Sequence, residues 1–499
     1  MIAREQSAVR NVGVLLALRG FQVAGGLVFA AVVPRLMGPK GYGQVSLLVA
    51  LSMWFTMAAS LGFTEVLGRQ VPRLMQSGGM EALRDFVSRL LAIRSAIGLC
   101  SAGAYLAVTI FWLRDLDKTA MVLLSLAACV RAPSALFFSL HLGLNRADRW
   151  GIADIVRQWG YMVLMLPGFL LGGLRGAALG VLILELAVFA LGFFGTRACF
   201  AWSGFRLSFA GMAPVLRFGL VFYACDLVSA ALERSADVLL RAMAGDYAQI
   251  GFFRVAYSAY STIAVGIPRI ALAFMPLLTM LCLEGNRTAM REWLERLLKW
   301  LAVGGMVVVL GATLVGNDLV PLVLGRAYAP VAANLTALSV ALLGLSLTSV
   351  ANLAALTFDR PAMALITALA RLAAFWLFGV LLVGRFGSLG ASVSALGALL
   401  VQAGVFTVAM RRVAGYSLGQ WLLVVALGAV FLPLRLIHGS AYLHAALLCV
   451  AIAGYAGLLF WFRLVTVEEL RAAKRALGRR SSGDSSKSRD PEDRACASP

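Results

Sequence analysis

Long apolar runs separated by short polar connections occupy almost all of this 499-residue sequence. Hydrophobic residues make up 61% of the chain and the mean hydropathy is +0.86. A soluble globular chain would be nearer half apolar. Because the runs are continuous and do not alternate with polar residues, they favour membrane-spanning helices over barrel strands. The sequence therefore predicts an all-α integral membrane protein.

About fourteen transmembrane helices are expected if each span needs about twenty apolar residues. Lys and Arg are concentrated in the connections on the side of the N-terminus, which predicts that both termini are cytoplasmic. The predicted spans are 12–34, 42–64, 90–112, 120–144, 151–173, 177–200, 213–241, 247–280, 297–316, 331–357, 362–383, 389–410, 419–437 and 442–462.

Three short segments recur in order at an offset of roughly 205 to 215 residues, which indicates an internal duplication. A duplicated protein with many spans is typically a transporter whose halves enclose a site near the midplane of the bilayer. The recurring pairs are Arg35–Val45 with Arg241–Gly251, Asp148-Arg149 with Asp359-Arg360, and Leu174–Ala177 with Ser388–Ala391. The predicted domains are two pseudo-symmetric six-helix bundles (1–205 and 206–412), two additional helices (413–463), and a basic interfacial helix with a disordered cytoplasmic tail (464–499).

The sequence lacks the motifs of several function classes, which makes those classes less favoured. The net charge of +20 is spread over many turns, so it indicates membrane topology and not nucleic-acid binding. There is no Walker A motif and no connection long enough for a soluble catalytic domain. The seven cysteines lie singly, which gives no metal or redox framework. We therefore expect a non-enzymatic protein with no metal and no cofactor, with H⁺ or Na⁺ as the candidate coupling ion.

Ionisable residues inside the predicted spans are the candidate functional residues, because such groups are costly unless they pair or face a wet cavity. Asp226, Glu233 and Asp237 fall on one stripe of the predicted span 213–241, and Arg241 follows one turn later as the expected partner of Asp237. These charges either neutralise one another between helices or line a lumen. In the second case the three carboxylates are the candidate ion-coupling residues.

Arginines in the spans match or exceed the carboxylates, so a shared cavity would be neutral to cationic and would suit an anion. Arginine is the better phosphate ligand because its planar fork binds two oxygens and keeps its charge. Arg157 and Arg217 lie nearer the cytoplasmic ends, where interfacial anchoring is the expected role. The candidate substrate-binding residues are Arg254, Arg269, Arg19, Arg371 and Arg131.

Four segments in order carry a family resemblance: Arg35–Gly43, Asp237–Tyr247, Leu324–Tyr328 and Gly387–Ala391. Over Met1–Arg463 the sequence resembles the polysaccharide, or O-antigen, flippase branch of the multidrug/oligosaccharidyl-lipid/polysaccharide (MOP) exporter superfamily. The resemblance implies two six-helix bundles related by an axis along the membrane normal, plus two C-terminal helices.

The same resemblance implies a function. Such a protein would flip an undecaprenyl-diphosphate-linked oligosaccharide across the bacterial inner (plasma) membrane by alternating access, for the synthesis of cell-surface polysaccharide. The implied partners are the lipid-linked glycan, membrane lipids and glycan polymerase or assembly proteins.

Three alternatives stay open. A flippase for the lipid-linked peptidoglycan precursor has a similar architecture, and Arg19 lies in a comparable part of the first span, but no clear acidic partner follows it. A cationic-drug or metabolite exporter of the same fold is expected to have a cavity dominated by carboxylates and aromatics. A membrane glycosyltransferase or polymerase is the third.

Overall fold

A computed structural model gives the structure of residues 2–466 except 78, 145–146, 202–204, 209–212 and 361; for some helical residues, residues 2–23 among them, it describes only the backbone. Helices make up most of this part of the chain, and no strand occurs in it. Nine of the described helices are long and apolar enough to cross a membrane. The prediction of an all-α membrane protein is confirmed, whereas the count of about fourteen spans stays a prediction.

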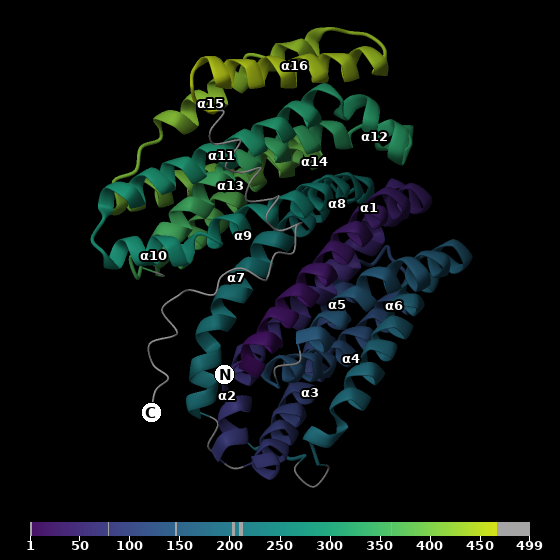
Figure 1. The fold of residues 1–499 in the computed structure, drawn as a ribbon. Coiled ribbons are helices and arrows are strands. Elements are labelled where there is room, and N and C mark those ends of the chain that lie inside the picture. Colours follow the sequence, from purple (N-terminus) through teal and green to yellow (C-terminus); the bar gives the residue numbers. More distant parts are fainter. Residues whose placement is uncertain are drawn as a thin grey trace, which may run out of the picture.

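The first part of the chain forms a group of helices, here called the N-terminal group (Figure 1). A π-helical turn, η1, separates two of its helices. The members are α1 (Ile2–Ala58), α2 (Phe63–Ser77), α3 (Gly79–Trp112), α4 (Lys118–Gly143), α5 (Ala147–Gly160), η1 (Tyr161–Met165) and α6 (Leu166–Thr196), followed by a short 3₁₀ turn, η2 (Arg197–Cys199).

The next helices form the C-terminal group, and two further helices, α15 and α16, pack on its helix α11 through a separate apolar cluster. The members of the C-terminal group are α7 (Ala213–Met243), α8 (Tyr247–Ala264), α9 (Gly266–Leu272), α10 (Met275–Leu283), α11 (Arg287–Leu314), α12 (Gly316–Leu324), η4 (Arg326–Tyr328), α13 (Val331–Thr357) and α14 (Ala362–Ala414). Beyond them lie α15 (Gly419–Ala429), η5 (Leu432–Leu436) and α16 (Ala441–Trp461).

In Figure 1 the helices α2 to α6 lie on one side and α9 to α14 on the other, with α1, α7 and α8 between them. Helix α1 packs extensively against α8, so the two groups meet along these helices. The predicted domain boundaries near residues 205, 412 and 463 stay a prediction.

Three long helices are interrupted at a glycine that has a positive φ. These are Gly38 in α1, Gly173 in α6 and Gly387 in α14, with φ of 71°, 58° and 55°. A straight helix of 53 residues, the length of α14, would run about 80 Å, far beyond a hydrocarbon core of about 30 Å. At Gly173 the chain doubles back so closely that a Cβ on Gly168 would lie 2.3 Å from the carbonyl oxygen of Gly176. Gly38 and Gly387 lie in predicted turns between two spans, and Gly173 is the last residue of the predicted span 151–173.

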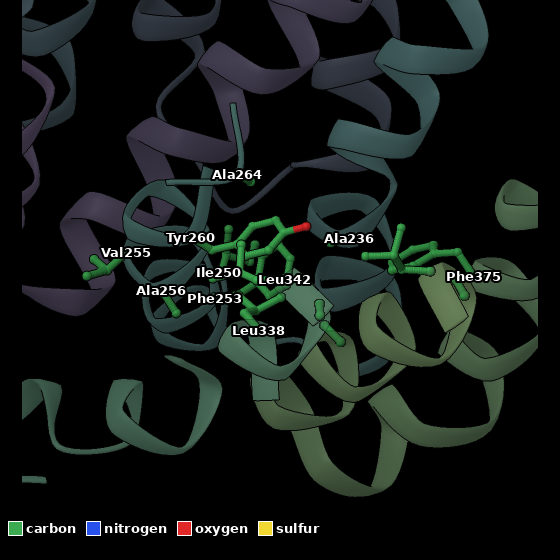
Figure 2. Packing of buried hydrophobic residues seen from close by; sticks show 14 of the residues in the cluster. Ala236, Ile250, Phe253, Val255, Ala256, Tyr260, Ala264, Leu338, Leu342 and Phe375 are labelled. Atoms are coloured by element: carbon green, nitrogen blue, oxygen red, sulfur yellow. The ribbon is translucent and has the colours of Figure 1, made fainter. Parts of the chain in front are cut away.

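Buried apolar residues hold α7, α8, α13 and α14 together, as Figure 2 shows. Phe253 and Tyr260 of α8 lie against Leu338 and Leu342 of α13. Phe375 of α14 lies near Ala236 of α7. The Phe253 side chain is almost completely buried. This packing fixes α7 and α8, the two helices that carry most of the charged residues described next.

Candidate functional site

A cavity of about 470 Å³ lies where the two groups of helices meet. The N-terminal group contributes α1, α5 and η1 to its wall, and the C-terminal group contributes α7, α8 and α9. Among the described residues, the charged ones that line it are Glu233, Arg234, Arg254 and Arg269, all from the C-terminal group. Three arginines against one glutamate make this wall cationic, which suits an anionic ligand.

The described residues of the N-terminal wall include polar side chains but no charged one. The hydrogen-bonding side chains of this wall are Tyr42, Ser46, Gln158 and Tyr161. On the opposite wall, α8 adds the hydroxyl groups of Tyr257, Ser258, Ser261 and Thr262. A ligand with an anionic head and many hydroxyl groups could therefore find partners on both walls.

Arg254 forms a buried ion pair with Asp237. Its Nε lies 2.6 Å from Oδ1 of Asp237 and its Nη2 also contacts Oδ2, so the pair is bidentate. Arg254 is 7% exposed and Asp237 only 1%. The predicted pair between Asp237 and Arg241 is wrong, because Asp237 faces α8 and meets Arg254 there. The charge of Arg254 is therefore already compensated inside the C-terminal group.

Arg234 and Arg269 are more available to an anionic ligand than Arg254, because neither is held in a buried ion pair. The Nη2 atom of Arg234 lies 3.2 Å from a carboxylate oxygen of its neighbour Glu233, whose side chain is 49% exposed. Arg269 is exposed, and the described residues provide no ion pair for it. Arg269 lies on α9, which begins after a break at Val265 and contains Pro268, as the sequence predicts for a kink at this proline.

Arg131 belongs to a buried cluster behind the N-terminal wall. Glu185, 1% exposed, accepts from Nε and Nη2 of Arg157 at 3.1 Å, and Nη1 of Arg131 lies 3.5 Å from Oε1 of the same carboxylate. Arg157 is thus part of an internal ion cluster, and the expectation that it is an interfacial anchor is wrong. The Glu185 carboxylate on α6 binds the Arg157 guanidinium more favourably than the lipid headgroups would.

The remaining predicted residues are not among the described lining of the cavity. Arg371 is a half-buried residue of α14. Arg19 and Asp226 lie on α1 and α7, but their side chains are outside the described part of the structure, as is that of Arg217. Glu233 is the predicted carboxylate that the structure brings into the cavity wall, whereas Asp237 lies behind it.

One end of the cavity is closed by contacts between the two groups, and we call it the Asp115 end. Asp115, in the turn after α3, accepts from Nη2 of Arg241 at 2.7 Å and from the hydroxyl of Tyr247 at 2.8 Å. The hydroxyl of Tyr328 donates to the carbonyl oxygen of Pro34 at 2.6 Å. These bonds join the turn after α3 to α7 and α8, and α1 to η4.

The Asp115 end also brings two helix backbones into direct contact. A Cβ on Gly43 of α1 would lie 1.8 Å from the carbonyl oxygen of Tyr247, and a Cβ on Gly251 of α8 would lie 2.3 Å from the carbonyl oxygen of Pro39. Only glycine allows this approach. Because Tyr42 and Val45 line the cavity beside this contact, the contact closes the cavity at this end.

The turn that carries Asp115 is itself held by Asp117. Its carboxylate accepts from the backbone amides of Thr119 and Ala120 at 2.8 and 3.4 Å and from Nε of Arg175. Partial desolvation raises the pKa of Asp117, but the bonds from Arg175 and the amides outweigh it, and the net pKa is lowered. Asp117 is therefore ionised at neutral pH and caps the start of α4.

The sequence reasoning did not identify the uncharged polar residues of the cavity. Gln158 and Tyr161 follow Arg157 within about one helical turn, a polar cluster inside an apolar run that could have marked a wet helix face. Tyr42 is the first residue of the predicted span 42–64 and lies in the segment Arg35–Gly43 that carries the family resemblance. Within the described part of the chain, no group of three or more His, Cys, Asp or Glu residues is arranged to hold a metal ion.

Two solved transporter structures share this architecture. The Lipid II flippase MurJ, in an inward closed conformation, matches with a TM-score of 0.65 and 12% identity over 92% of this chain and 100% of that chain. An inward-facing multidrug resistance MATE family transporter of the MOP superfamily matches with a TM-score of 0.64 and 16% identity, over 79% and 94% of the two chains. At these identities the matches show a common fold.

Sequence comparison identifies the family more directly. No curated protein matches the sequence. The family model described as "Polysaccharide biosynthesis protein" matches residues 8–282, which is more than half of the chain, and with the shared fold it confirms the predicted resemblance to the MOP exporter superfamily. The chain belongs to the polysaccharide biosynthesis protein family.

Proposed function

We propose that this protein is a flippase that moves an undecaprenyl-diphosphate-linked oligosaccharide across the bacterial inner membrane by alternating access. The observation that carries the proposal is the cavity between the two groups, lined by three arginines and one glutamate. Its cationic wall matches a diphosphate, and its hydroxyl and amide groups match a glycan. Membership of the family and the fold shared with a lipid flippase support the same conclusion.

In this proposal Arg269 and Arg234 bind the diphosphate, because their forks are not locked in a buried ion pair. Arg254 contributes to the wall but mainly neutralises Asp237. Arg131, Arg19 and Arg371 stay candidates for weaker, more distant attraction of the anion.

Coupling to an ion gradient is the second part of the proposal. Glu233 is the best placed carboxylate, since its side chain is 49% exposed and lies at the cavity wall. It could exchange its bond to Arg234 for a proton or Na⁺ and release that arginine to the substrate. Asp226, seven residues before Glu233 on the same stripe of α7, remains a candidate, whereas Asp237 is committed to Arg254.

The proposed orientation places the Asp115 end outside the cell and both chain termini in the cytoplasm, as the distribution of Lys and Arg indicates. A topology reporter inserted in the turn 114–118 is expected to report the outside, and one fused after Arg463 is expected to report the cytoplasm. The reverse pattern for both fusions would contradict the orientation and leave the fold unaffected.

The proposed function is tested by reconstitution. Purified protein in vesicles should move a fluorescent polyprenyl-diphosphate oligosaccharide between leaflets, measured by the fraction of label that an impermeant quencher reaches over time. An organic cation serves as the competing substrate, because the fold is shared with a multidrug transporter. Transport of the cation without the glycolipid would favour the drug exporter, and transfer of sugar to an acceptor would favour an enzyme.

Replacing Arg269 by Ala is expected to reduce glycolipid transport at least tenfold without changing the amount of folded protein. The loss of one charge-assisted contact is worth about 1.5–3 kcal/mol, and no buried partner is left behind. Arg269→Lys should recover part of the rate, since Lys supplies charge without the fork. Arg385→Ala, an exposed arginine outside the cavity, is the control. Equal rates for Arg269→Ala and the control would remove Arg269 from the site.

A further inference from the structure

Gln158 of α5 presents a free amide to the cavity. It is half-buried in the N-terminal wall, in a segment, Ile155–Cys199, that is long and apolar enough to cross a membrane. A glutamine amide has two N–H donors and a carbonyl acceptor, yet none of the described residues forms a hydrogen bond with this one. Because an amide without partners is costly in apolar surroundings, water or a ligand must satisfy Gln158.

The residues on either side of Gln158 fix its position. Nη2 of Arg157 lies 3.1 Å from Oε2 of Glu185 on α6. Trp159 packs against α1 so closely that a Cβ on Gly25 would lie 3.1 Å from its indole ring. The two neighbours are thus held by α6 and α1, and the Gln158 side chain is left to the cavity. A group that is positioned before its ligand arrives loses less conformational freedom on binding.

The chemistry of the amide indicates which part of a glycolipid it fits. A sugar hydroxyl both donates and accepts, so two adjacent hydroxyls can bind the carbonyl and an N–H of one amide. An ionised phosphate oxygen only accepts and would leave the amide carbonyl without a partner. On the opposite wall, the hydroxyls of Ser261 and Thr262 donate to the Ser258 carbonyl oxygen at 3.0 and 2.8 Å, so these two can only accept from a ligand. Gln158 can donate and accept at once.

We propose that Gln158 binds two adjacent hydroxyl groups of the sugar next to the diphosphate and so makes binding depend on that sugar. This inference rests on the proposed function, in which Arg234 and Arg269 bind the diphosphate from the C-terminal wall, and it adds a sugar subsite on the N-terminal wall. The cavity of about 470 Å³ lies within the range of sites for drug-sized molecules, about 300–1,000 Å³. It therefore suits the diphosphate with its first sugar and not a long glycan.

The test compares two ligands on the purified full chain in detergent, with binding measured by calorimetry. One is a polyprenyl diphosphate without sugar, and the other is the same lipid with one hexose. Gln158→Met, which keeps an unbranched side chain of similar length, is expected to weaken binding of the hexose lipid by a factor of about 5 to 150 through the loss of two hydrogen bonds. Binding of the lipid without sugar should stay unchanged. Gln402→Met is the matched control, because Gln402 is a half-buried residue of α14 outside the described cavity lining.

Deoxy sugars test the contact with adjacent hydroxyls. A set of hexose lipids, each lacking one ring hydroxyl, is compared on the parent protein and on Gln158→Met. Two neighbouring deoxy positions should weaken binding to the parent, whereas Gln158→Met should bind those two ligands as well as it binds the complete hexose. A direct contact appears in such a cycle as losses that are not additive. Additive losses at every position would overturn the contact.

The two levels of proposal fail differently. No binding of any polyprenyl diphosphate to the parent protein would contradict the proposed function. Binding of both lipids by the parent, with Gln158→Met changing neither affinity or weakening both by the same factor, would contradict only the assignment of Gln158 to the sugar.

Discussion

Replacing Arg254 by Ala is expected to remove most of the folded protein and not only its transport. The change leaves Asp237, 1% exposed, as a buried carboxylate without its bidentate partner. Breaking a buried ion pair from one side typically costs about 3–5 kcal/mol, which is a large part of the stability of most proteins. The measurement is the yield of monodisperse protein in detergent and its midpoint of thermal unfolding.

The matching double variant separates stability from substrate binding. Arg254→Leu with Asp237→Leu removes both charges and fills the space with apolar atoms, so it is expected to recover the yield that Arg254→Ala loses. Glu295 gives a control ion pair, because its partner Arg291 is an exposed residue one turn away; Arg291→Ala should cost about 1 kcal/mol at most. A stable Arg254→Ala protein that no longer transports would instead make Arg254 a substrate ligand.

The ion pairs divide into two kinds with different consequences for movement. Glu185 with Arg157 and Asp237 with Arg254 lie within one group each, and their burial makes them expensive to break. Asp115 with Arg241 joins the two groups, and the Asp115 side chain is 48% exposed. The groups can therefore change their relative position without exposing an unpaired buried charge, provided that the Asp115 contact opens.

The sequence was sufficient to locate the chain reversals. Gly38 and Gly387 lie in predicted turns, Gly173 ends the predicted span 151–173, and each adopts a φ that other residues rarely adopt. Local sequence carries this information, because a run that exceeds the bilayer thickness must bend and glycine tolerates the required backbone. Composition also predicts membrane-spanning helices, and nine of the described helices are long and apolar enough to span, whereas the count of about fourteen stays a prediction.

The partners of the charged residues could not be predicted in the same way. Asp237 and Arg241 are four residues apart, which is the favourable helical spacing, yet each binds a residue from another helix or turn. The partner with which a charged side chain forms its ion pair depends on which face of its helix packs against the neighbouring helices. That choice is made by packing between distant segments and leaves little trace in a single sequence.

The uncharged polar residues of the cavity wall were also not predictable from the sequence. Tyr161 has no charge, and it begins the π-helical turn between α5 and α6. Ionisable residues stand out in an apolar run because they are costly in a membrane. Neutral hydroxyl and amide groups cost less there, so their positions carried a weaker signal.

The closed Asp115 end gives the second large expected effect. Gly43 is packed so closely against the Tyr247 carbonyl oxygen that any side chain at this position must push α1 and α8 apart. Overpacking of this kind costs about 1–3 kcal/mol. If that cost falls only on the conformation closed at this end, the ratio of open to closed molecules rises by a factor of about 5 to 150. Gly43→Ala should therefore hold the cavity open to the outside and stop transport.

Sidedness of labelling measures this effect. In a variant without its seven native cysteines, a cysteine at Ser258 lies in the cavity wall, and an impermeant thiol reagent added to intact cells should reach it faster when Gly43 is Ala. Gly304→Ala is the control, since this helical glycine has open space where its Cβ would lie. Equal labelling in Gly43→Ala and Gly304→Ala, with normal amounts of folded protein, would show that the contact between α1 and α8 does not close the cavity. Faster labelling with transport intact would show that closure at this end is not required for the cycle.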